Sequence, residues 1–577
     1  MLKNHSFKFQ YLSLLIYVIS ILIISANKVQ ANDEKVRFNN LNQEPLIESE
    51  INHSSLYGDK NKDIITQTEN NQPQSIFVRE IKVLGSTVFS NNQLQQTVQS
   101  FTNKELTPEE IRKAADAITQ LYLNENYLNS RAIPVTQTAE NTKNGIVEIQ
   151  IIEGSLAEIQ IIGTRKLSQN YIRNRIQLGA SVPLNAIKLE KKLRLLRVDP
   201  LIDNVEASLR PSGNIGQSIL VVRVKEAKSF QVDLSADNYL HPSIGAEKLG
   251  IQLAEKNLTG IGDELALAYY RSVTGGANIF DFSYQIPVNA MDGKVKIRFA
   301  PSNSEITSGE FKDLGIKAES ELYEINYRQP LVRTPREELA LSLGFIHQNG
   351  QTFLNFDQPF PFAVGTDPDG VSRTSVIQFA QDYVKRDSQG AWSLRSQLNF
   401  GVGLLDATIN NEPTPDSRFF SWLGQIQRVQ KLNEDHLLIL QADLQLTPDS
   451  LLPSQQFIIG GGQSIRGYRQ NARSGDNGFR IAIEDRITVH RNVAGLPVIQ
   501  VIPFTNIGTV WNKSGNPNTL QDQTFLASAG LGLLWYQALG IDNLTMRLDY
   551  GIPFVELDDK GNNAQDEGFY FSLRYQP

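Results

Sequence analysis

Hydrophobic and polar residues alternate along most of this chain from residue 228 to residue 577. Apolar side chains recur at every second position in runs such as 339–345, 392–402, 438–446 and 544–550, and turns rich in Gly, Pro, Asn and Asp separate the runs. A period of two is typical of a β-strand with one apolar and one polar face. The pattern therefore predicts a mainly β region of antiparallel strands joined by turns.

By itself, this alternation fits both a soluble β-sandwich and a membrane barrel. Two features favour the barrel. Many runs are about 9 to 11 residues long, which is the span of a tilted strand across a bilayer. The polar face carries full charges, as at Lys294, Lys296 and Arg298, and these suit a wet interior. The length of the region predicts a transmembrane antiparallel β-barrel of about sixteen strands, which is too wide to be filled by its own wall side chains.

The preceding part of the chain shows strands and helices in succession. Residues 76–154 predict the order strand, helix, helix, strand, strand, and Thr107–Glu110 supplies an N-cap, a first-turn proline and acidic residues for the second helix. The same order follows in residues 155–227, where Glu158–Gly163 echoes Glu80–Gly85 after about 78 positions. A chance echo of two amphipathic strands is the alternative. The matching order of five elements favours a duplicated small α+β domain.

Residues 1–31 are typical of a secretory signal peptide, with Lys3 and Lys8 ahead of an apolar run over residues 11–25. A retained membrane anchor is the alternative, but the apolar run is shorter than the ~20 residues that a spanning helix needs. No later stretch is apolar enough to span as a helix, so membrane insertion would require a closed barrel. We interpret residues 32–75 as a polar linker and leave open whether it holds a helix that plugs the barrel.

The composition narrows the chemistry. The net charge of −7 provides no basic surface for nucleic acid, so nucleic acid is not an expected partner. The absence of cysteine excludes disulfides, thiolate metal sites and cysteine nucleophiles. The six histidines form no metal-ligand spacing, and there is no phosphate-binding glycine loop. Gly462–Arg466 departs from the Gly-x-Ser-x-Gly nucleophile motif at its last position. We therefore expect no metal, no cofactor and no enzymatic activity.

The sharpest local motif is Gly460–Tyr468, with the sequence GGGQSIRGY. Glycines permit a tight, closely packed loop, and Arg466 places a permanent cation with a planar set of donors among them. A surface turn is the alternative interpretation. Here the sequence closely resembles the two-partner secretion transporters of the ShlB/FhaC/HecB haemolysin secretion and activation family, whose signature is a [VI]RGY loop after a GG turn.

The resemblance extends over nearly all of the mature chain. The two repeats resemble POTRA domains, with Arg131–Pro134 and Glu153–Gly154 in the expected places. Asn257–Asp263 resembles the early barrel turn of the family, and Tyr327–Leu331 resembles its mid-barrel strand. The implied organisation is a signal peptide over 1–31, a polar linker over 32–75, POTRA-like domain 1 over 76–154, POTRA-like domain 2 over 155–227 and an outer-membrane β-barrel over 228–577.

The resemblance also implies roles for single residues. The expected motif of the lumen loop is Ile465, Arg466, Gly467 and Tyr468. In the family its arginine meets an acid on a Phe-x-Asp-x-Gly wall strand, and the matching residues here are Phe504, Asn506 and Gly508. An asparagine thus replaces the expected aspartate, and an amide oxygen accepts a hydrogen bond without neutralising a guanidinium. We therefore expect another carboxylate beside Arg466, with Glu484 and Asp485 as candidates.

By this resemblance the protein is an outer-membrane translocator with its N-terminal domains in the periplasm. It would export a large partner protein of the adhesin or haemolysin type by two-partner (type V) secretion without ATP. The implied partners are the secreted protein docking on the POTRA-like domains, outer-membrane lipid, and the barrel assembly machinery, which would read the closing strand over 569–575. A barrel assembly insertase of the same superfamily is the main alternative, and a passive porin or surface adhesin is the second.

Overall fold

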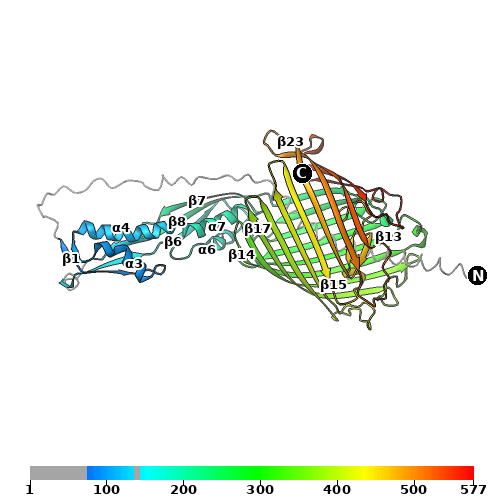
Figure 1. The fold of residues 1–577 in the computed structure, drawn as a ribbon, viewed down its shortest axis with the longest axis horizontal. Helices are drawn as coiled ribbons and strands as arrows, with labels where there is room; N and C mark the ends of the chain where they lie inside the picture. Colours follow the sequence, from blue (N-terminus) through cyan, green and yellow to red (C-terminus); the bar gives the residue numbers. More distant parts are fainter. Residues whose placement is uncertain (1–74, 136–142) are drawn as a thin grey trace, which may run out of the picture. The chain divides into compact units, whose positions relative to one another are not determined.

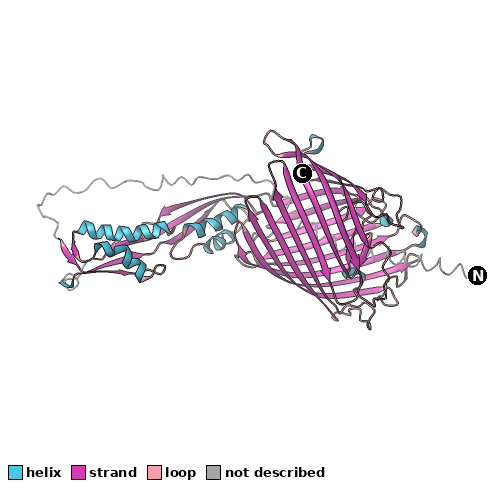
Figure 2. Cartoon of the chain, in the orientation of Figure 1, coloured by secondary structure: helices cyan, strands magenta, loops and turns pink. Residues whose placement is uncertain are grey.

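The computed structural model describes residues 75–135 and 143–577, which divide into two compact units between Ala227 and Lys228. The predicted signal peptide and all of the predicted linker except Ser75 lie outside the described residues. Strands dominate the structure, and most of its helical residues belong to the unit that precedes Lys228 (Figure 2). Among the described residues, no helix is long and apolar enough to cross a membrane.

The first domain consists of a three-stranded sheet, two α-helices and a small two-stranded sheet. Its elements are β1 Ile76–Val78, β2 Glu80–Leu84, α3 Asn91–Val98, η3 Gln99–Phe101, β3 Lys104–Leu106, α4 Pro108–Asn124, β4 Arg131–Pro134 and β5 Ile146–Ile152. The sheet has the order β2-β5-β4, and β1 pairs with β3 in a separate two-stranded antiparallel sheet that the sequence pattern did not predict. Buried apolar residues of the sheet and of both helices form one core.

The predicted start of α4 is present in the structure. The Thr107 hydroxyl accepts a hydrogen bond from the Glu110 backbone N–H, and the Glu110 carboxylate accepts one from the Thr107 backbone N–H at 2.7 Å. This reciprocal capping satisfies two donors that a helix start otherwise leaves unpaired. The hydrogen bonds from Thr107 also lower the pKa of Glu110. Ile111, Ile118 and Tyr122 then recur at helical spacing and are buried against the sheet.

The second domain repeats the order strand, helix, helix, strand, strand, and among the described residues it has no counterparts of β1 and β3. Its members are β6 Ser155–Ile162, α6 Gln169–Gln177, α7 Ala186–Arg197, β7 Ile202–Pro211 and β8 Gln217–Glu226, with the sheet order β6-β8-β7. In both domains a glycine with positive φ follows the strand that precedes the first helix, Gly85 at +88° after β2 and Gly163 at +97° after β6. A Cβ at either position would meet a backbone carbonyl oxygen of the last strand, so the close approach of the chain requires glycine.

In each domain a glutamate lies at the end of the last strand, Glu153 after β5 and Glu226 at the end of β8. Its carboxylate accepts hydrogen bonds from the backbone of the loop that precedes the first helix. In the second domain the Glu226 carboxylate accepts hydrogen bonds from the backbone of Arg165, Lys166 and Leu167 at 2.6 to 3.2 Å. Burial alone raises the pKa of Glu226. The three backbone N–H groups and the charge of Arg165 outweigh burial, and they lower the pKa below the ordinary value of 4.5.

A depressed pKa makes the stability of the second domain depend on pH. The contribution of ionised Glu226 is present above the unfolded-state pKa and is lost as the pH falls through the lower folded-state pKa. We expect Glu226→Gln to lower the free energy of unfolding by about 1 kcal/mol at neutral pH, a value reduced for the partial exposure of the side chain. The variant should also lose the part of the pH dependence of stability that ionised Glu226 provides. Pulse proteolysis in urea on the full-length protein measures both effects. Glu190→Gln, which removes an exposed pair with Arg194, is the matched control.

The second unit is a closed barrel that contains sixteen long strands within the described residues. They are β9 Phe230–Asp237, β10 Lys248–Lys256, β11 Glu264–Ser272, β12 Ala277–Pro287, β13 Lys294–Glu305, β14 Lys317–Arg333, β15 Glu337–Leu354, β17 Val371–Asp387, β18 Gly390–Val402, β19 Phe420–Lys431, β20 His436–Leu446, β23 Asn477–Arg491, β24 Pro497–Trp511, β25 Phe525–Tyr536, β26 Leu544–Pro553 and β27 Phe569–Tyr575. The two-residue strand β16 Gln358–Pro359 pairs with the end of β15, and short 3-10 turns cover Pro242–Ile244, Lys312–Leu314 and Ala538–Gly540. Figure 1 shows the strands following one another around the wall. The predicted class and strand number are confirmed.

The faces of the strands are those of a membrane barrel, with apolar side chains outside and polar side chains inside. On β15, Leu343 is 57% exposed whereas its neighbour Ser342 is 6% exposed. Several strands are longer than the predicted ~9 to 11 residues, and β14, β15 and β17 have 17, 18 and 17. Their additional outward positions include Glu319, Glu321 and Asn349, so the strands continue past the apolar band. Alternation persists there, and the sequence period therefore does not mark the membrane boundary.

The barrel closes at a short seam between β27 and β9. The two strands pair only from Ser572 opposite Asp237 to Tyr575 opposite Leu234. Beyond this pairing, the side chain of Asn238 continues the ladder. Its Nδ2 donates to the carbonyl oxygen of Phe569 at 3.0 Å, and its Oδ1 accepts from the backbone N–H of Phe571 at 2.9 Å. One amide side chain thus provides the donor and the acceptor that another strand residue would supply.

We expect Asn238→Ala to weaken the seam, because it removes the partner of one part-buried backbone donor and one part-buried backbone acceptor of β27. The expected loss of stability is about 1 to 3 kcal/mol. The temperature at which the folded barrel loses its fast electrophoretic migration in detergent measures the effect. Asn238→Asp keeps the acceptor and loses the donor, so its transition should lie between those of the wild type and the alanine variant. Equal transitions in all three proteins would contradict this role of Asn238.

Candidate functional site

The glycine-rich motif lies on the long loop between β20 and β23. The loop contains the 3-10 turn η6 Pro453–Gln455 and the short antiparallel strands β21 Phe457–Ile459 and β22 Arg473–Gly475. Between these strands, the tip over 460–472 is largely buried. Its contacts are with the polar faces of β23, β24, β26 and β27, which point into the barrel. The loop therefore folds back into the lumen, as the resemblance implied.

The tip approaches the wall closely because a glycine lies opposite it. A Cβ on Gly551 of β26 would lie 2.6 Å from the backbone N of Gly467 and 2.8 Å from the carbonyl carbon of Arg466. Gly530 is the partner of Gly551 on β25, so two adjacent strands are free of side chains at this point. Gly467 itself has φ +100°, a conformation that favours glycine. Backbone thus packs directly on backbone at the tip of the loop.

Arg466 is the centre of the contacts at the tip. Its side chain is 6% exposed, and its Nε donates to Asn506 Oδ1 at 3.1 Å. Nη1 lies 3.3 Å from Glu484 Oε2 and 3.3 Å from Asp549 Oδ1. The guanidinium stacks on the ring of Phe504, with 3.4 Å between its central carbon and the ring centroid. Asn506 therefore accepts a hydrogen bond, as its chemistry predicted, and two carboxylates supply the charge.

Of the two carboxylates proposed from the sequence, Glu484 contacts Arg466 and Asp485 does not. Asp485 lies on the outward face of β23 with Ile483, because successive side chains of a strand point to opposite sides. Its Oδ2 contacts Nδ1 of His436 on the neighbouring strand at 2.7 Å. Asp549 was missed as a partner, although alternation over 544–550 already placed it on a polar face. It is 83 residues from Arg466, and only closure of the barrel brings the two together.

The other residues of the motif fill the space between the loop and the wall. Ile465 is fully buried, and a Cβ on Gly508 would lie 2.8 Å from its Cδ1, so this wall position also requires a small residue. The Tyr468 hydroxyl donates to the carbonyl oxygen of Ala527 at 2.7 Å. The Gly467 backbone N–H donates to the hydroxyl of Tyr570 at 2.9 Å. All four motif residues thus contact the barrel wall.

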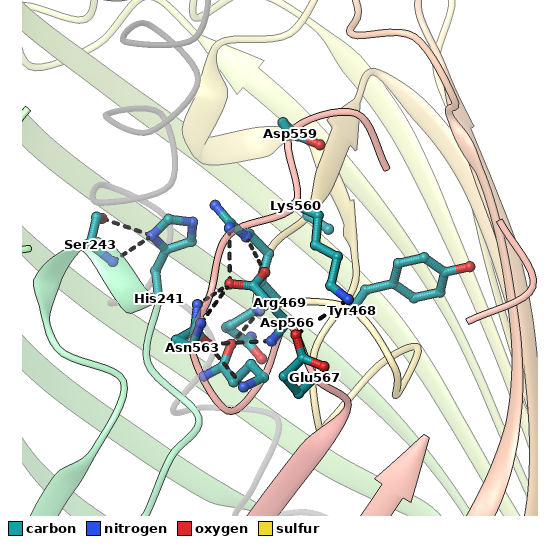
Figure 3. Close-up of polar contacts among 12 residues, drawn as sticks. His241, Ser243, Tyr468, Arg469, Asp559, Lys560, Asn563, Asp566 and Glu567 are labelled. Carbon is teal, nitrogen blue, oxygen red and sulfur yellow. Dashed lines mark hydrogen bonds and ion pairs between the residues drawn. The ribbon is translucent and has the colours of Figure 1, made fainter. Parts of the chain in front are cut away.

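A second set of contacts joins the loop to the connection between β26 and β27. Arg469 binds Asp566 through two donors at 2.8 and 3.0 Å, and the Gln470 backbone N–H donates to Gln565 Oε1 at 2.7 Å. Figure 3 shows Arg469 directed towards Asp566, with Tyr468 pointing the other way. Sequence analysis singled out none of these partners, because they are about a hundred residues from the motif and belong to no local pattern.

All of these contacts are noncovalent and lie within a lumen that the loop partly fills. Salt bridges and hydrogen bonds of this kind stabilise the loop in its inserted conformation, and they still allow a conformation in which the loop has left the wall. Within the described residues, no group of three or more His, Cys, Asp or Glu side chains is placed to hold a metal ion. The arrangement is therefore suited to holding and releasing a segment of the chain inside the barrel.

The fold and this lumen loop define an outer-membrane β-barrel transporter with POTRA-like domains. The chain belongs to the haemolysin secretion/activation protein ShlB/FhaC/HecB family, whose sequence model matches residues 216–534. The model of the ShlB-type POTRA domain matches residues 76–154.

Individual relatives agree with this assignment. The heme/hemopexin transporter protein HuxB of Haemophilus influenzae (strain 86-028NP) is 23% identical over 491 residues, which are 84% of this chain and 83% of HuxB. The solved structure of CdiB from Escherichia coli superposes with a TM-score of 0.66 at 19% identity, covering 96% of this chain and 97% of CdiB. BamA from Haemophilus ducreyi lacking POTRA domains 1–3 reaches 0.51 at 15% identity, covering 87% of this chain and all of that one.

These comparisons confirm the predicted family and the location in the outer membrane with N-terminal domains in the periplasm. The protein is a two-partner secretion transporter that acts with a secreted partner protein. The insertase alternative is not supported, because the sequence matches are to secretion transporters and BamA is only a distant structural neighbour. Members of the family are transporters.

Proposed function

We propose that the protein exports one large partner of the adhesin or haemolysin type, which arrives unfolded, docks on the two POTRA-like domains and threads the lumen past the displaced loop. The observation that carries the proposal is the loop over 447–476, which occupies the lumen and is held there by noncovalent contacts centred on Arg466. A polypeptide needs that space, and the strands of the loop, β21 and β22, pair only with each other and not with the barrel wall. The loop is therefore the element that moves during export.

The POTRA-like domains offer strand edges to an extended peptide. In the sheet order β6-β8-β7, β7 is an edge strand of ten residues, and most of its side chains are exposed. An edge of this length supplies unpaired backbone groups to which a segment of the partner adds as a further strand. Side-chain pockets are not needed for such pairing, which suits a partner that is still unfolded.

Export by this route needs no nucleotide. The sequence has no phosphate-binding glycine loop, and folding of the partner outside the cell makes its passage irreversible. The apolar outer face of the strands contacts outer-membrane lipid. The closing strand β27, followed by Gln576 and Pro577, is the segment that the barrel assembly machinery recognises. No step of this scheme is enzymatic.

The proposal is tested by conductance and binding measured together. The bait is the N-terminal segment of a large secreted protein, to be sought first among the genes that neighbour the gene of this chain. We expect the full-length protein to bind the bait, and to conduct in planar bilayers with fluctuations that the bait changes. A porin would conduct without binding, and an insertase would instead accelerate the insertion of other barrels into liposomes. Either of these results would overturn the proposal.

A further inference from the structure

Arg466 shares both of its carboxylate partners with a second arginine, Arg547. Glu484 Oε2 lies 3.3 Å from Nη1 of Arg466 and 3.2 Å from Nη2 of Arg547. Asp549 Oδ1 lies 3.3 Å from Nη1 of Arg466 and 3.1 Å from Nη2 of Arg547. The second oxygen of Asp549 is 2.7 Å from Nε of Arg547. The same two oxygen atoms are therefore bound twice, and Arg547 is the nearer donor to each.

Arg547 belongs to the wall and not to the loop. It lies on β26. A second wall arginine, Arg486 of β23, binds the other carboxylate oxygen of Glu484 through two nitrogen atoms, at 2.9 and 3.0 Å. Withdrawal of the loop removes Arg466 and leaves both acids with a wall arginine. This matters energetically, because a buried charge left without a partner is strongly destabilising.

Among the described side chains of this cluster, the charges also balance without the loop. Arg486 and Arg547 face Glu484 and Asp549, which makes two cations and two anions on the wall. With Arg466 in place, the same cluster has three cations and two anions. Asn506 contributes an acceptor and no charge. Counted over the side chains that the structure describes, the cluster with the loop inserted thus carries one more positive charge than the cluster without it.

We propose that Arg547 is a resident counter-ion, which takes over Glu484 and Asp549 when Arg466 leaves and so makes the withdrawal of the loop reversible. This inference rests on the proposed function, in which the loop moves during export. Arg547 acts through Arg466 and is a positioning residue. A residue that only braced the site would loosen the loop when removed. A counter-ion has the opposite effect, because without it the two acids depend on Arg466 and hold the loop more tightly.

Loop withdrawal is measurable with one thiol, since the chain contains no cysteine. Ser464 lies at the tip of the loop and is buried, so Ser464→Cys should react with a maleimide only when the loop leaves the wall. The labelling rate is measured on the full-length protein in outer-membrane vesicles. We expect Arg547→Gln to slow labelling about tenfold, and Arg547→Lys, which keeps the charge, to remain within about twofold of the parent. Labelling of Arg547→Gln at the parental rate or faster would overturn the inference.

A second variant keeps the test decisive if Arg547→Gln does not fold, which the heat-shifted electrophoretic band shows. Asn506→Asp is close to isosteric and gives the cluster three anions for three cations, so it should also slow labelling. Unchanged or faster labelling in that variant would contradict the charge argument. Failure of the proposed function is recognised separately, by the conductance and bait-binding measurements, whatever the labelling rates of the Arg547 variants.

Discussion

Arg466→Ala is expected to reduce export of the partner protein at least tenfold while the barrel still inserts into the outer membrane. The side chain is buried and contacts Asn506, Glu484 and Asp549. Breaking a buried ion pair costs about 3 to 5 kcal/mol, and we reduce this to about 2 kcal/mol because Arg547 still neutralises both acids. A loss of this size removes the preference of the loop for its inserted position. Immunoblots of the medium measure export, and the heat-shifted band measures insertion.

Two further variants sharpen this test. Arg466→Lys keeps the charge but lacks the planar set of donors that bridges both acids and Asn506, so its export should fall between those of the wild type and alanine variants. Arg418→Ala removes an arginine that is 55% exposed and pairs with Asp416 in the connection between β18 and β19, and it should export normally. Equal export by all three variants would show that the anchoring of Arg466 is not needed for transport.

Gly551→Val is expected to displace the tip of the loop and to raise the conductance of the barrel severalfold. A Cβ at this position lies under 3.0 Å from backbone atoms of Arg466 and Gly467, and backbone has no rotamer with which to avoid the clash. All charges of the cluster remain, so this variant tests the steric contact between β26 and the tip of the loop separately from the electrostatic contacts. Valine is well suited to a strand, and the barrel should therefore stay folded. Single-channel recording in planar bilayers measures the conductance.

The matched control for this prediction is Gly403→Val, which lies in the connection between β18 and β19. The nearest atom to a Cβ there is the flexible end of Ile409, at 3.3 Å, so the local structure should adjust and the conductance should not change. A wild-type conductance in Gly551→Val would mean that the tip of the loop does not depend on its contact with β26. The same result together with slow thiol labelling at position 464 would mean that the tip tolerates the added side chain in place.

The sequence was informative wherever a property depends on neighbouring residues. Alternation identified the strands and their two faces, as at Ser342 and Leu343, and the helix start at Thr107 was readable from four consecutive residues. The departure at Asn506 also had a local chemical meaning, because an amide does not neutralise a guanidinium. It correctly indicated that a carboxylate would lie beside Arg466. What alternation did not provide was the end of the apolar band, since the period continues on the longer strands.

The amino-acid sequence by itself determined the order of the strands and helices and which side chains face the lumen, because both follow from periodicity over a few residues. The class of the protein came from the length of the strand region and from the resemblance carried by the motif over 460–468. Only the tertiary structure decided which lumen residues meet. Arg466 and Asp549 are 83 positions apart, and the registers of all strands around the closed barrel bring them within 3.3 Å. The contacts of Arg547 with the same two acids depend on that closure too, because a one-residue slip of β26 would turn the side chain of Arg547 to the lipid.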